Sequence, residues 1–428
     1  MDILKYLDKF EKFTKDPTLK AMEFIMQRLG NPEKNTKFIH VAGTNGKGSV
    51  CEMLSNVLVK QGYIVGKFIT PHLIDFKEEI SVNNINILDS ELENIISELQ
   101  LIIEEYDSNN EIKVKWFEVI TSVALKYFSD KKCDIVVLET GLGGTTDCTN
   151  IVDSLISVIC NIGYDHMAIL GNTIEEISTH KAGIIKENKD TVFVYQDKVI
   201  DVIKSKCEEK NNKLHIIQKE EITNYSYNQD FQIFDYKKYN KIEINLKGKE
   251  QIYNAATCLE SFEILKEKGY NISEENIRHG LNTVIHKARF EVLSKNPKVI
   301  FDGGHNENAI KNLVCTLRQY YENRKIVYIL SIITTKDYKT IIKNIVQDKN
   351  SVIFVTDGDS EKGDHDFVPK EILYKEVKEN QVYQNEIFID SLENAINSSI
   401  NNYSNDIICI AGSFYVYDKA KKHIDKLL

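Results

Sequence analysis

Residues 38–51 read FIHVAGTNGKGSVC, and this stretch decides the fold that we expect. An apolar run leads into three glycines, and a lysine and a serine stand just before a helical pattern. Glycines free the backbone so that several N–H groups can point at one anion, and a helix that begins there presents its N-terminus to phosphate. Lys47 supplies a mobile cation, and the Ser49 hydroxyl can ligate Mg²⁺. The stretch therefore predicts a phosphate-binding loop after a buried strand.

The spacing differs from that of the common P-loop, because Gly48 separates the lysine from the serine. A plain glycine-rich turn between a strand and a helix is the simpler alternative. The order of strand, lysine, serine and helix favours the phosphate site, and the extra glycine does not harm its physics. The predicted nucleotide contacts in this loop are Gly43, Thr44, Asn45, Gly46, Lys47, Gly48 and Ser49.

Short β-branched runs recur along the chain, and helical patterns separate most of them. The runs are 38–41, 135–138, 155–160, 191–195, 299–301, 325–330, 352–355 and 407–410, and the clearest helical patterns are 50–61, 116–128 and 309–321. Strands and helices in alternation indicate parallel sheets with crossover helices. In such sheets ligands collect at the carboxyl ends of the strands, so the segments that follow the strands are the candidate site.

A chain of 428 residues is too long for one comfortable domain, so we expect two. Residues 1–284 should form a P-loop-type ATPase domain with a parallel sheet, and residues 285–428 a Rossmann-like α/β domain. The region 212–250 reads differently, because its short alternating runs suggest a small antiparallel patch at the edge of the first domain. Those runs are 214–217, 231–234 and 242–246.

The composition excludes several classes of protein. The net charge of −10 disfavours nucleic acid and anionic membranes as partners, although a local basic pocket can still hold a small anion. The eight cysteines stand singly, which suggests reduced thiols in a reducing compartment. The N-terminus lacks the apolar core of a signal peptide, and no run is apolar enough to span a membrane, so we expect a cytoplasmic protein.

Two polar side chains at strand ends suggest a metal. Glu139 follows a buried run and precedes glycines, and a carboxylate there is a hard oxygen ligand for Mg²⁺. A turn-stabilising carboxylate is the plainer reading. His166 follows another strand, and a lone histidine is more often a hydrogen-bonded structural residue than a ligand. Its place at the same predicted sheet edge as Lys47 and Glu139 favours a metal site.

Eight segments, taken in order, resemble the marks of the folylpolyglutamate synthase/dihydrofolate synthase family within the Mur ligase superfamily. They are HVAGTNGKGS (40–49), TPHL (70–73), ETGLGGTTDCTN (139–150), GYDHMAILGNTIEEISTHKAGIIK (163–186), QIYNAA (251–256), ARF (288–290), FDGGHN (301–306) and AGSFY (411–415). The resemblance thus extends over nearly the whole chain.

The resemblance implies ATP and two Mg²⁺ ions, and leaves room for a monovalent K⁺. The implied metal ligands are Ser49, Thr70, Glu139, His166 and Lys181, and the implied catalytic groups are Lys47, Lys181, His166 and Glu139. A single lysine on a helix is normally a solvated surface charge. In the family the lysine that matches Lys181 is carbamylated by CO₂, which requires a neutral amine and therefore a lowered pKa.

The resemblance also assigns substrate contacts. Arg289, Asp302 and His305 would contact ATP when the two domains close, with Asn254 near the nucleoside. From the residues alone, a structural aspartate in a strand-to-helix turn and a surface arginine stay open as readings of Asp302 and Arg289. The remaining implied contacts are His72 and Asp147 for the folate and His305 and Ser413 for glutamate.

These marks imply an ATP-dependent amide ligase that joins L-glutamate to the carboxylate of a folate through an acyl phosphate, acting as a monomer. Thr145 and Thr146 stand where many family members carry a large basic or apolar pair, so acceptance of dihydropteroate beside glutamylated folate is left open. Two other classes remain. One is an amide ligase of the same superfamily with a different acceptor, and the other is an ATP-binding homologue without catalysis.

Overall fold

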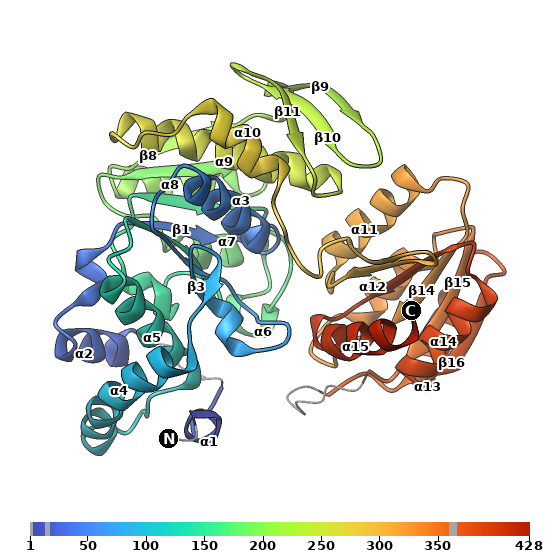
Figure 1. Cartoon of the computed structure of the whole chain (residues 1–428), viewed down its shortest axis with the longest axis horizontal. Coiled ribbons are helices and arrows are strands. Elements are labelled where there is room, and N and C mark those ends of the chain that lie inside the picture. The colour runs from blue at the N-terminus through green and yellow to red at the C-terminus, as the bar shows by residue number, and fades with distance from the viewer. Residues whose placement is uncertain (1–2, 13–17, 359–365) are drawn as a thin grey trace. The chain divides into compact units, whose positions relative to one another are not determined.

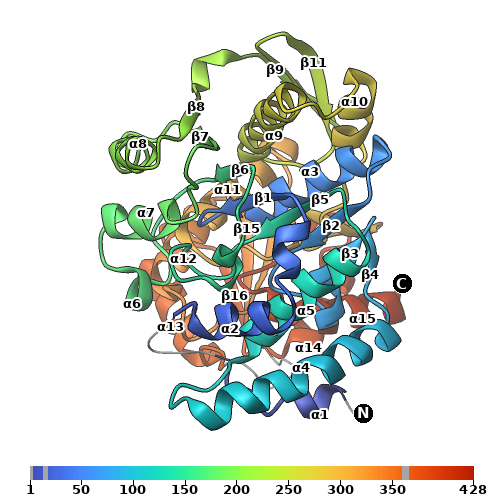
Figure 2. The same cartoon turned by 90° about the vertical axis from the view of Figure 1, so that its left-hand side faces the viewer.

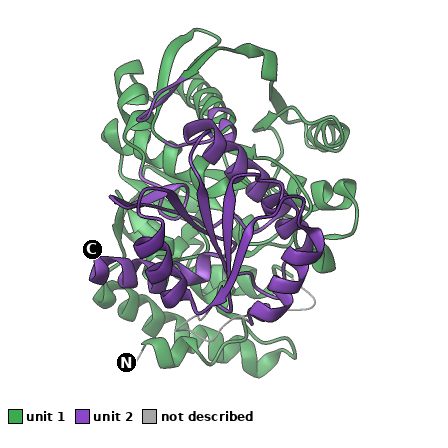
Figure 3. Cartoon of the chain, turned by 90° about the vertical axis from the view of Figure 1, so that its right-hand side faces the viewer, with its two compact units in different colours: residues 1–226, 233–245, 253–284 green, residues 227–232, 246–252, 285–428 purple. Residues whose placement is uncertain are grey.

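The computed structural model describes residues 3–12, 18–358 and 366–428. The chain divides into two compact units, shown in green and purple in Figure 3. The first comprises residues 1–226, 233–245 and 253–284, and the second comprises residues 227–232, 246–252 and 285–428. Among the described residues no helix is both long and apolar enough to cross a membrane.

The first unit is built on an eight-stranded sheet of order β4-β3-β2-β5-β1-β6-β7-β8 (Figures 1 and 2). Its strands are β1 (Phe38–Ala42), β2 (Val65–Phe68), β3 (Ile80–Val82), β4 (Ile85–Asn86), β5 (Ile135–Glu139), β6 (Ile156–Ile159), β7 (Asp190–Val194) and β8 (Lys213–Ile217). The six strands β2, β5, β1, β6, β7 and β8 run parallel to one another. Strands β3 and β4 continue the sheet beyond β2 as an antiparallel edge. Strands β1 and β5 are buried at every position, because helices cover both faces of the sheet.

Helices pack against this sheet with two apolar cores. The helices of the first part of the chain are α1 (Ile3–Leu7), α2 (Lys20–Arg28), α3 (Lys47–Lys60), α4 (Asp89–Asn109), α5 (Trp116–Asp130), α6 (Met167–Leu170), α7 (Ile174–Ala182), α8 (Ile200–Glu209), α9 (Lys249–Glu267) and α10 (Glu274–Asn282). Phe38 and Leu138 face a core shared with α2, α4 and α5, whereas Ala42 and Ile159 face one shared with α7 and α8. Residues an even number of positions apart on a strand share a face, so Phe38 and Ala42, and with them both cores, lie on the same face of the sheet.

The sequence prediction for the antiparallel patch was partly wrong. The run 214–217 belongs to β8, which pairs in parallel with β7 at the edge of the large sheet. This edge strand is only partly buried, from the exposed Lys213 to the buried Ile217, and so lacks the continuous burial of β1 and β5. A separate three-stranded sheet of order β11-β10-β9 forms from β9 (Ile222–Tyr227), β10 (Gln232–Tyr236) and β11 (Tyr239–Ile244).

The second unit contains a six-stranded sheet of order β12-β13-β17-β14-β15-β16. Its strands are β12 (Glu291–Lys295), β13 (Lys298–Asp302), β14 (Ile326–Leu330), β15 (Ser351–Thr356), β16 (Glu386–Asp390) and β17 (Ile407–Ala411), and its helices are α11 (Glu307–Tyr320), α12 (Tyr338–Ile345), α13 (Lys370–Asn380), α14 (Leu392–Asn402) and α15 (Tyr417–Leu427). All strands are parallel except β12, an antiparallel edge strand that the sequence reading missed. The predicted α/β class with parallel sheets is confirmed.

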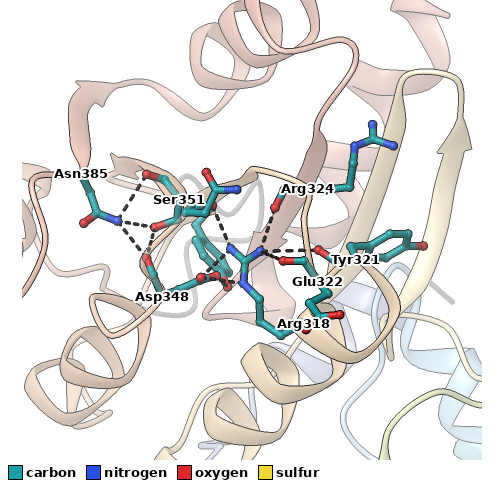
Figure 4. A network of polar contacts seen from close by, with 9 residues as sticks. Arg318, Tyr321, Glu322, Arg324, Asp348, Ser351 and Asn385 are labelled. Carbon is teal, nitrogen blue, oxygen red and sulfur yellow. Dashed lines mark hydrogen bonds and ion pairs between the residues drawn. The ribbon is translucent and has the colours of Figure 1, made fainter.

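A polar network holds the amino ends of three strands of this sheet (Figure 4). Arg318 donates from Nε to Asp348 Oδ1 at 2.6 Å and from its other nitrogens to the carbonyl oxygens of Arg324 and Asn350. Tyr328 donates to the second oxygen of Asp348 at 2.7 Å, and the Asp348 side chain is 3% exposed. The network lies at the amino ends of the strands, whereas ligands of parallel sheets bind at the carboxyl ends. We therefore assign the network a role in the stability of the fold.

We expect Arg318→Met to lower the free energy of unfolding by about 3 kcal/mol, because it leaves a buried carboxylate without its cation. Urea unfolding followed by circular dichroism measures the loss. Lys325→Met is the matched control: its ion pair with Glu386 is exposed, so a change of about 0.5 kcal/mol or less is expected. Equal small effects of the two substitutions would contradict the role of the network.

Candidate active site

The strand register of the first unit brings three loops to one sheet edge. Val41 on β1 lies opposite Glu139 on β5, and Ala42 lies opposite Ile159 on β6. The segments that follow these strands therefore leave the sheet side by side. They include the glycine-rich loop, the segment that begins with Thr140 and the segment that carries His166, as the sequence analysis expected of parallel strands.

The glycine-rich loop is fixed against the segment after β6. The Thr44 N–H donates to the Asn161 carbonyl at 2.8 Å. The Thr44 hydroxyl donates to the Gly163 carbonyl at 3.0 Å and accepts from the Gly163 N–H at 3.1 Å. Thr44 is thus held through both its backbone N–H and its hydroxyl, which pre-organises the loop before α3.

At two positions of the loop, neighbouring atoms lie so close to the backbone that glycine is required. A Cβ on Gly43 would lie 2.7 Å from Cys160 Cβ. Gly46, the N-cap of α3, has φ of 93°, and a Cβ there would lie 2.7 Å from Asn254 Oδ1. The predicted nucleoside residue Asn254 therefore lies against the loop in the same unit. These contacts explain why the loop carries glycine at both positions.

The structure gathers four predicted residues around the start of α3. Lys47, its first residue, places Nζ 3.7 Å from Glu139 Oε1 and 3.5 Å from the Thr44 carbonyl. The Thr70 N–H donates to Glu139 Oε2 at 3.3 Å, and Ser49 is buried in the first turn of α3. A buried carboxylate, two hydroxyl residues and a cation thus meet at one helix N-terminus, which is an arrangement suited to phosphate with a hard metal ion.

Lys181 is buried, not a surface charge. Its Nζ donates to the Gly43 carbonyl at 2.7 Å from the last turn of α7. Burial, and next to it the positive charge of Lys47, lowers the pKa of Lys181 to about 7. A large fraction of this amine is therefore neutral near pH 7, which is the form that reacts with CO₂. Helix α7 also packs closely against Gly144, where a Cβ would lie 2.6 Å from the His180 carbonyl oxygen.

His166 caps α6 with φ of 51°, and its side chain is 47% exposed. Its Nε2 lies 3.8 Å from Asp165 Oδ1. Among the described residues no three His, Cys, Asp or Glu side chains gather into a metal-binding group. The predicted ligand set contains only two side chains of these types, so a metal bound there would also depend on hydroxyl groups and on oxygens of a bound phosphate.

Asp147 has a structural role in the loop after β5. Its Oδ2 accepts from the Leu142 N–H at 2.7 Å, and its Oδ1 accepts from the N–H and the hydroxyl of Thr149. Burial raises the pKa of this carboxyl, and these hydrogen bonds oppose that effect. The Thr149 hydroxyl in turn lies 2.8 Å from His40 Nε2 on β1. The carboxylate thus shapes the segment that follows Glu139, where the sequence had suggested a folate contact.

In the second unit, two predicted residues, Arg289 and His305, gather around an aromatic ring that the prediction did not include. The Arg289 guanidinium lies 4.2 Å from the centroid of Phe414, and the His305 ring meets Phe414 edge-on at 5.4 Å. A Cβ on Gly303 would lie 2.1 Å from the same ring. Phe414 belongs to the segment AGSFY at 411–415, and the position of this segment after a strand is the sequence feature that could have identified the residue.

Asp302 shapes the turn that presents Arg289. Its Oδ2 accepts from the Phe290 N–H at 2.9 Å, and its Oδ1 accepts from the Gly304 N–H at 2.8 Å. Burial raises the pKa of this carboxyl, whereas the charge of Arg289 opposes the rise. Ser413 is buried, and its Oγ accepts from the Tyr415 N–H at 3.2 Å as the N-cap of the 3₁₀ helix Phe414–Val416.

Comparison with known proteins decides the family. The family model described as Mur ligase middle domain matches residues 41–261, and the one described as Mur ligase, glutamate ligase domain matches residues 288–414. The dihydrofolate synthase/folylpolyglutamate synthase of Bacillus subtilis is 36% identical over 423 residues, with 96% of each chain covered. The chain belongs to the dihydrofolate synthase/folylpolyglutamate synthase family of Mur ligases.

Solved structures of the family share the fold over the whole length. The folylpolyglutamate synthase of Thermotoga maritima has 28% identity and a TM-score of 0.82, covering 100% of this chain and 97% of its own. Escherichia coli FolC, in complex with DHPP and ADP, has 27% identity and a TM-score of 0.85, covering 99% of this chain and 97% of its own. The expected resemblance and the two-domain ligase fold are therefore confirmed.

We predict that Lys181→Met changes how stability depends on pH. The unfolded lysine titrates at about 10.4, and the folded one at about 7. Between these values the unfolded chain binds more protons, so the free energy of unfolding of the wild type rises with pH. The variant lacks this term. The wild type should therefore gain stability relative to Lys181→Met from pH 7 to pH 9.5 in urea titrations, and parallel curves would contradict a lowered pKa.

Proposed function

We propose that the chain is an ATP-dependent ligase that joins L-glutamate to the carboxylate of a folate. The observation that carries the proposal is the phosphate loop, where Lys47 at the start of α3 lies 3.7 Å from the buried Glu139. Full-length similarity to relatives named for dihydrofolate and folylpolyglutamate synthesis supports the choice of substrate.

The proposed reaction has two steps. A carboxylate oxygen of the folate attacks the γ-phosphorus of ATP, and the bond to the β,γ-bridging oxygen breaks, which gives an acyl phosphate and ADP. The amine of L-glutamate then attacks the acyl carbon, inorganic phosphate leaves and the nitrogen loses a proton, which gives the amide. Transfer of this kind depends on positioning and charge neutralisation, and Lys47 is placed to offset charge on the phosphates.

The residues present fit Mg²⁺. Glu139 offers a buried carboxylate, and Ser49 and Thr70 offer hydroxyl oxygens of the hard type that Mg²⁺ prefers. These three would hold one ion, and His166 with a carbamate on Lys181 would hold a second. When bound, Mg²⁺ supplies positive charge against the phosphate oxygens.

The second unit would supply further nucleotide and substrate contacts. We assign Arg289, Asp302 and His305 to ATP and Asn254 to the nucleoside, with His305 and Ser413 near L-glutamate. The stack of Arg289 on Phe414 supports this assignment, because it restricts a long side chain before any ligand binds. Asp302 supports it by fixing the main chain on either side of the turn.

Lys47→Ala should reduce folate-dependent ADP release by at least about 100-fold, because removal of one preorganised group that stabilises developing charge costs roughly that much. A coupled ADP assay with tetrahydrofolate, L-glutamate, ATP and Mg²⁺ measures the change. Lys60→Ala, at the other end of α3, is the matched control and should keep wild-type activity. Near-normal turnover of Lys47→Ala would exclude the phosphate-loop assignment.

Lys181→Ala should be nearly inactive and should regain part of its activity with acetate or another short carboxylate. The added carboxylate would occupy the space of the proposed carbamate and offer the same oxygen ligands. The coupled ADP assay over a series of acetate concentrations measures the rescue, with chloride at equal ionic strength as the control. Full activity of Lys181→Ala without any carboxylate would rule out the carbamate.

A further inference from the structure

The loop after β2 is held by two adjacent glutamates at its far end. Glu78 Oε2 accepts from the N–H groups of Leu73 and Ile74 at 3.0 and 3.2 Å. Glu79 Oε1 accepts from the His72 N–H at 3.1 Å, and the Glu79 carbonyl accepts from the Ile69 N–H. The same loop meets the active site at Thr70. Its shape is therefore set by carboxylates that precede β3.

His72 and Glu79 form a buried pair. His72 Nδ1 lies 2.6 Å from Glu79 Oε1, and the glutamate side chain is 3% exposed while the histidine side chain is 22% exposed. Glu79 Oε2 is buried and has no hydrogen-bond partner among the described residues. Among the described residues, this carboxylate thus accepts hydrogen bonds from His72 alone.

The pair determines where the histidine carries its proton. A carboxylate can only accept hydrogen bonds, so the short contact requires the proton on Nδ1. In neutral imidazole the other nitrogen, Nε2, is then an acceptor. Nε2 makes no hydrogen bond to the part of the chain that the structure describes. The Trp116 ring lies beside His72, with ring centroids 6.5 Å apart.

We propose that Glu79 is a positioning residue that holds His72 in the Nδ1–H tautomer, so that Nε2 accepts a hydrogen bond from an N–H group of the acceptor substrate. This inference rests on the proposed function and deepens it. A flat aromatic group that carries an N–H donor fits a histidine acceptor beside an indole ring. In a folate, that donor is a pterin N–H, the bridging amine of the aminobenzoyl group or the amide N–H that joins this group to glutamate.

The first test observes the tautomer directly in the full chain, by ¹⁵N NMR of histidine-labelled protein, with His72→Gln to assign the signal. The wild type and Glu79→Gln should show a protonated Nδ1, because the glutamine oxygen still accepts. Glu79→Leu should lose that preference. Glu78→Leu is the matched control, since it loosens the same loop and leaves the pair intact. A proton on Nε2 in the wild type would overturn the proposal.

The second test separates positioning from folding. Glu79→Leu should raise the KM for tetrahydrofolate roughly tenfold, the loss of one hydrogen bond, while kcat and the KM for ATP stay within about twofold. Glu79→Gln should restore the wild-type KM. An equal rise in Glu78→Leu, or an unchanged KM in Glu79→Leu, would overturn the proposal.

A comparison of acceptors identifies the donor. The 10-formyl derivative of tetrahydrofolate has no N–H at the bridging nitrogen. If Glu79→Leu raises the KM for tetrahydrofolate alone, the bridging amine is the donor, whereas an equal rise for both acceptors points to the pterin or the benzoyl amide, which both acceptors keep. Absence of folate turnover in the wild type would instead refute the proposed function, and the NMR result would still decide the tautomer.

Discussion

The parallel pairing of β1 with β5 and β6 is the constraint on which the site depends. It sets Val41 beside Glu139 and Ala42 beside Ile159, so that the chain leaves all three strands at one edge. A shift of one residue would turn each side chain to the opposite face and remove Phe38 and Ala42 from their apolar cores. Because both cores are closed by helices, the register is strongly determined, and with it the distance from Lys47 to Glu139.

Charged groups lie inside the protein around this edge, and each has a specific partner. Lys181 Nζ donates to the Gly43 carbonyl, and the Glu139 carboxylate accepts from the Thr70 N–H and lies near Lys47. Two lysines close enough to affect one another electrostatically favour an anion between or beside them. A phosphate with a divalent metal ion meets that requirement, which links the buried charges to the proposed chemistry.

Much of the fold could be predicted, because the strand runs are apolar and the helices between them are long. The phosphate loop could be predicted as well, since its glycines, lysine and serine are adjacent in sequence. The burial of Lys181 could not, because its partner Gly43 is 138 residues away. For the same reason Phe414 could not be predicted as the ring beneath Arg289, whereas Glu79 is only seven residues from His72 and is brought to it by the conformation of the loop after β2. The strand β8 was misplaced because it lies at the edge of the sheet and is only partly buried.

The most direct test of the account is ADP release by the wild-type chain with ATP, Mg²⁺ and L-glutamate, comparing tetrahydrofolate with dihydropteroate. The account predicts turnover that requires a folate-type acceptor and yields one added glutamate per ADP, identified by mass spectrometry. Turnover with both acceptors would define a bifunctional enzyme, and turnover with tetrahydrofolate alone a dedicated polyglutamate synthase. ADP release with neither acceptor above the acceptor-free rate would contradict the account.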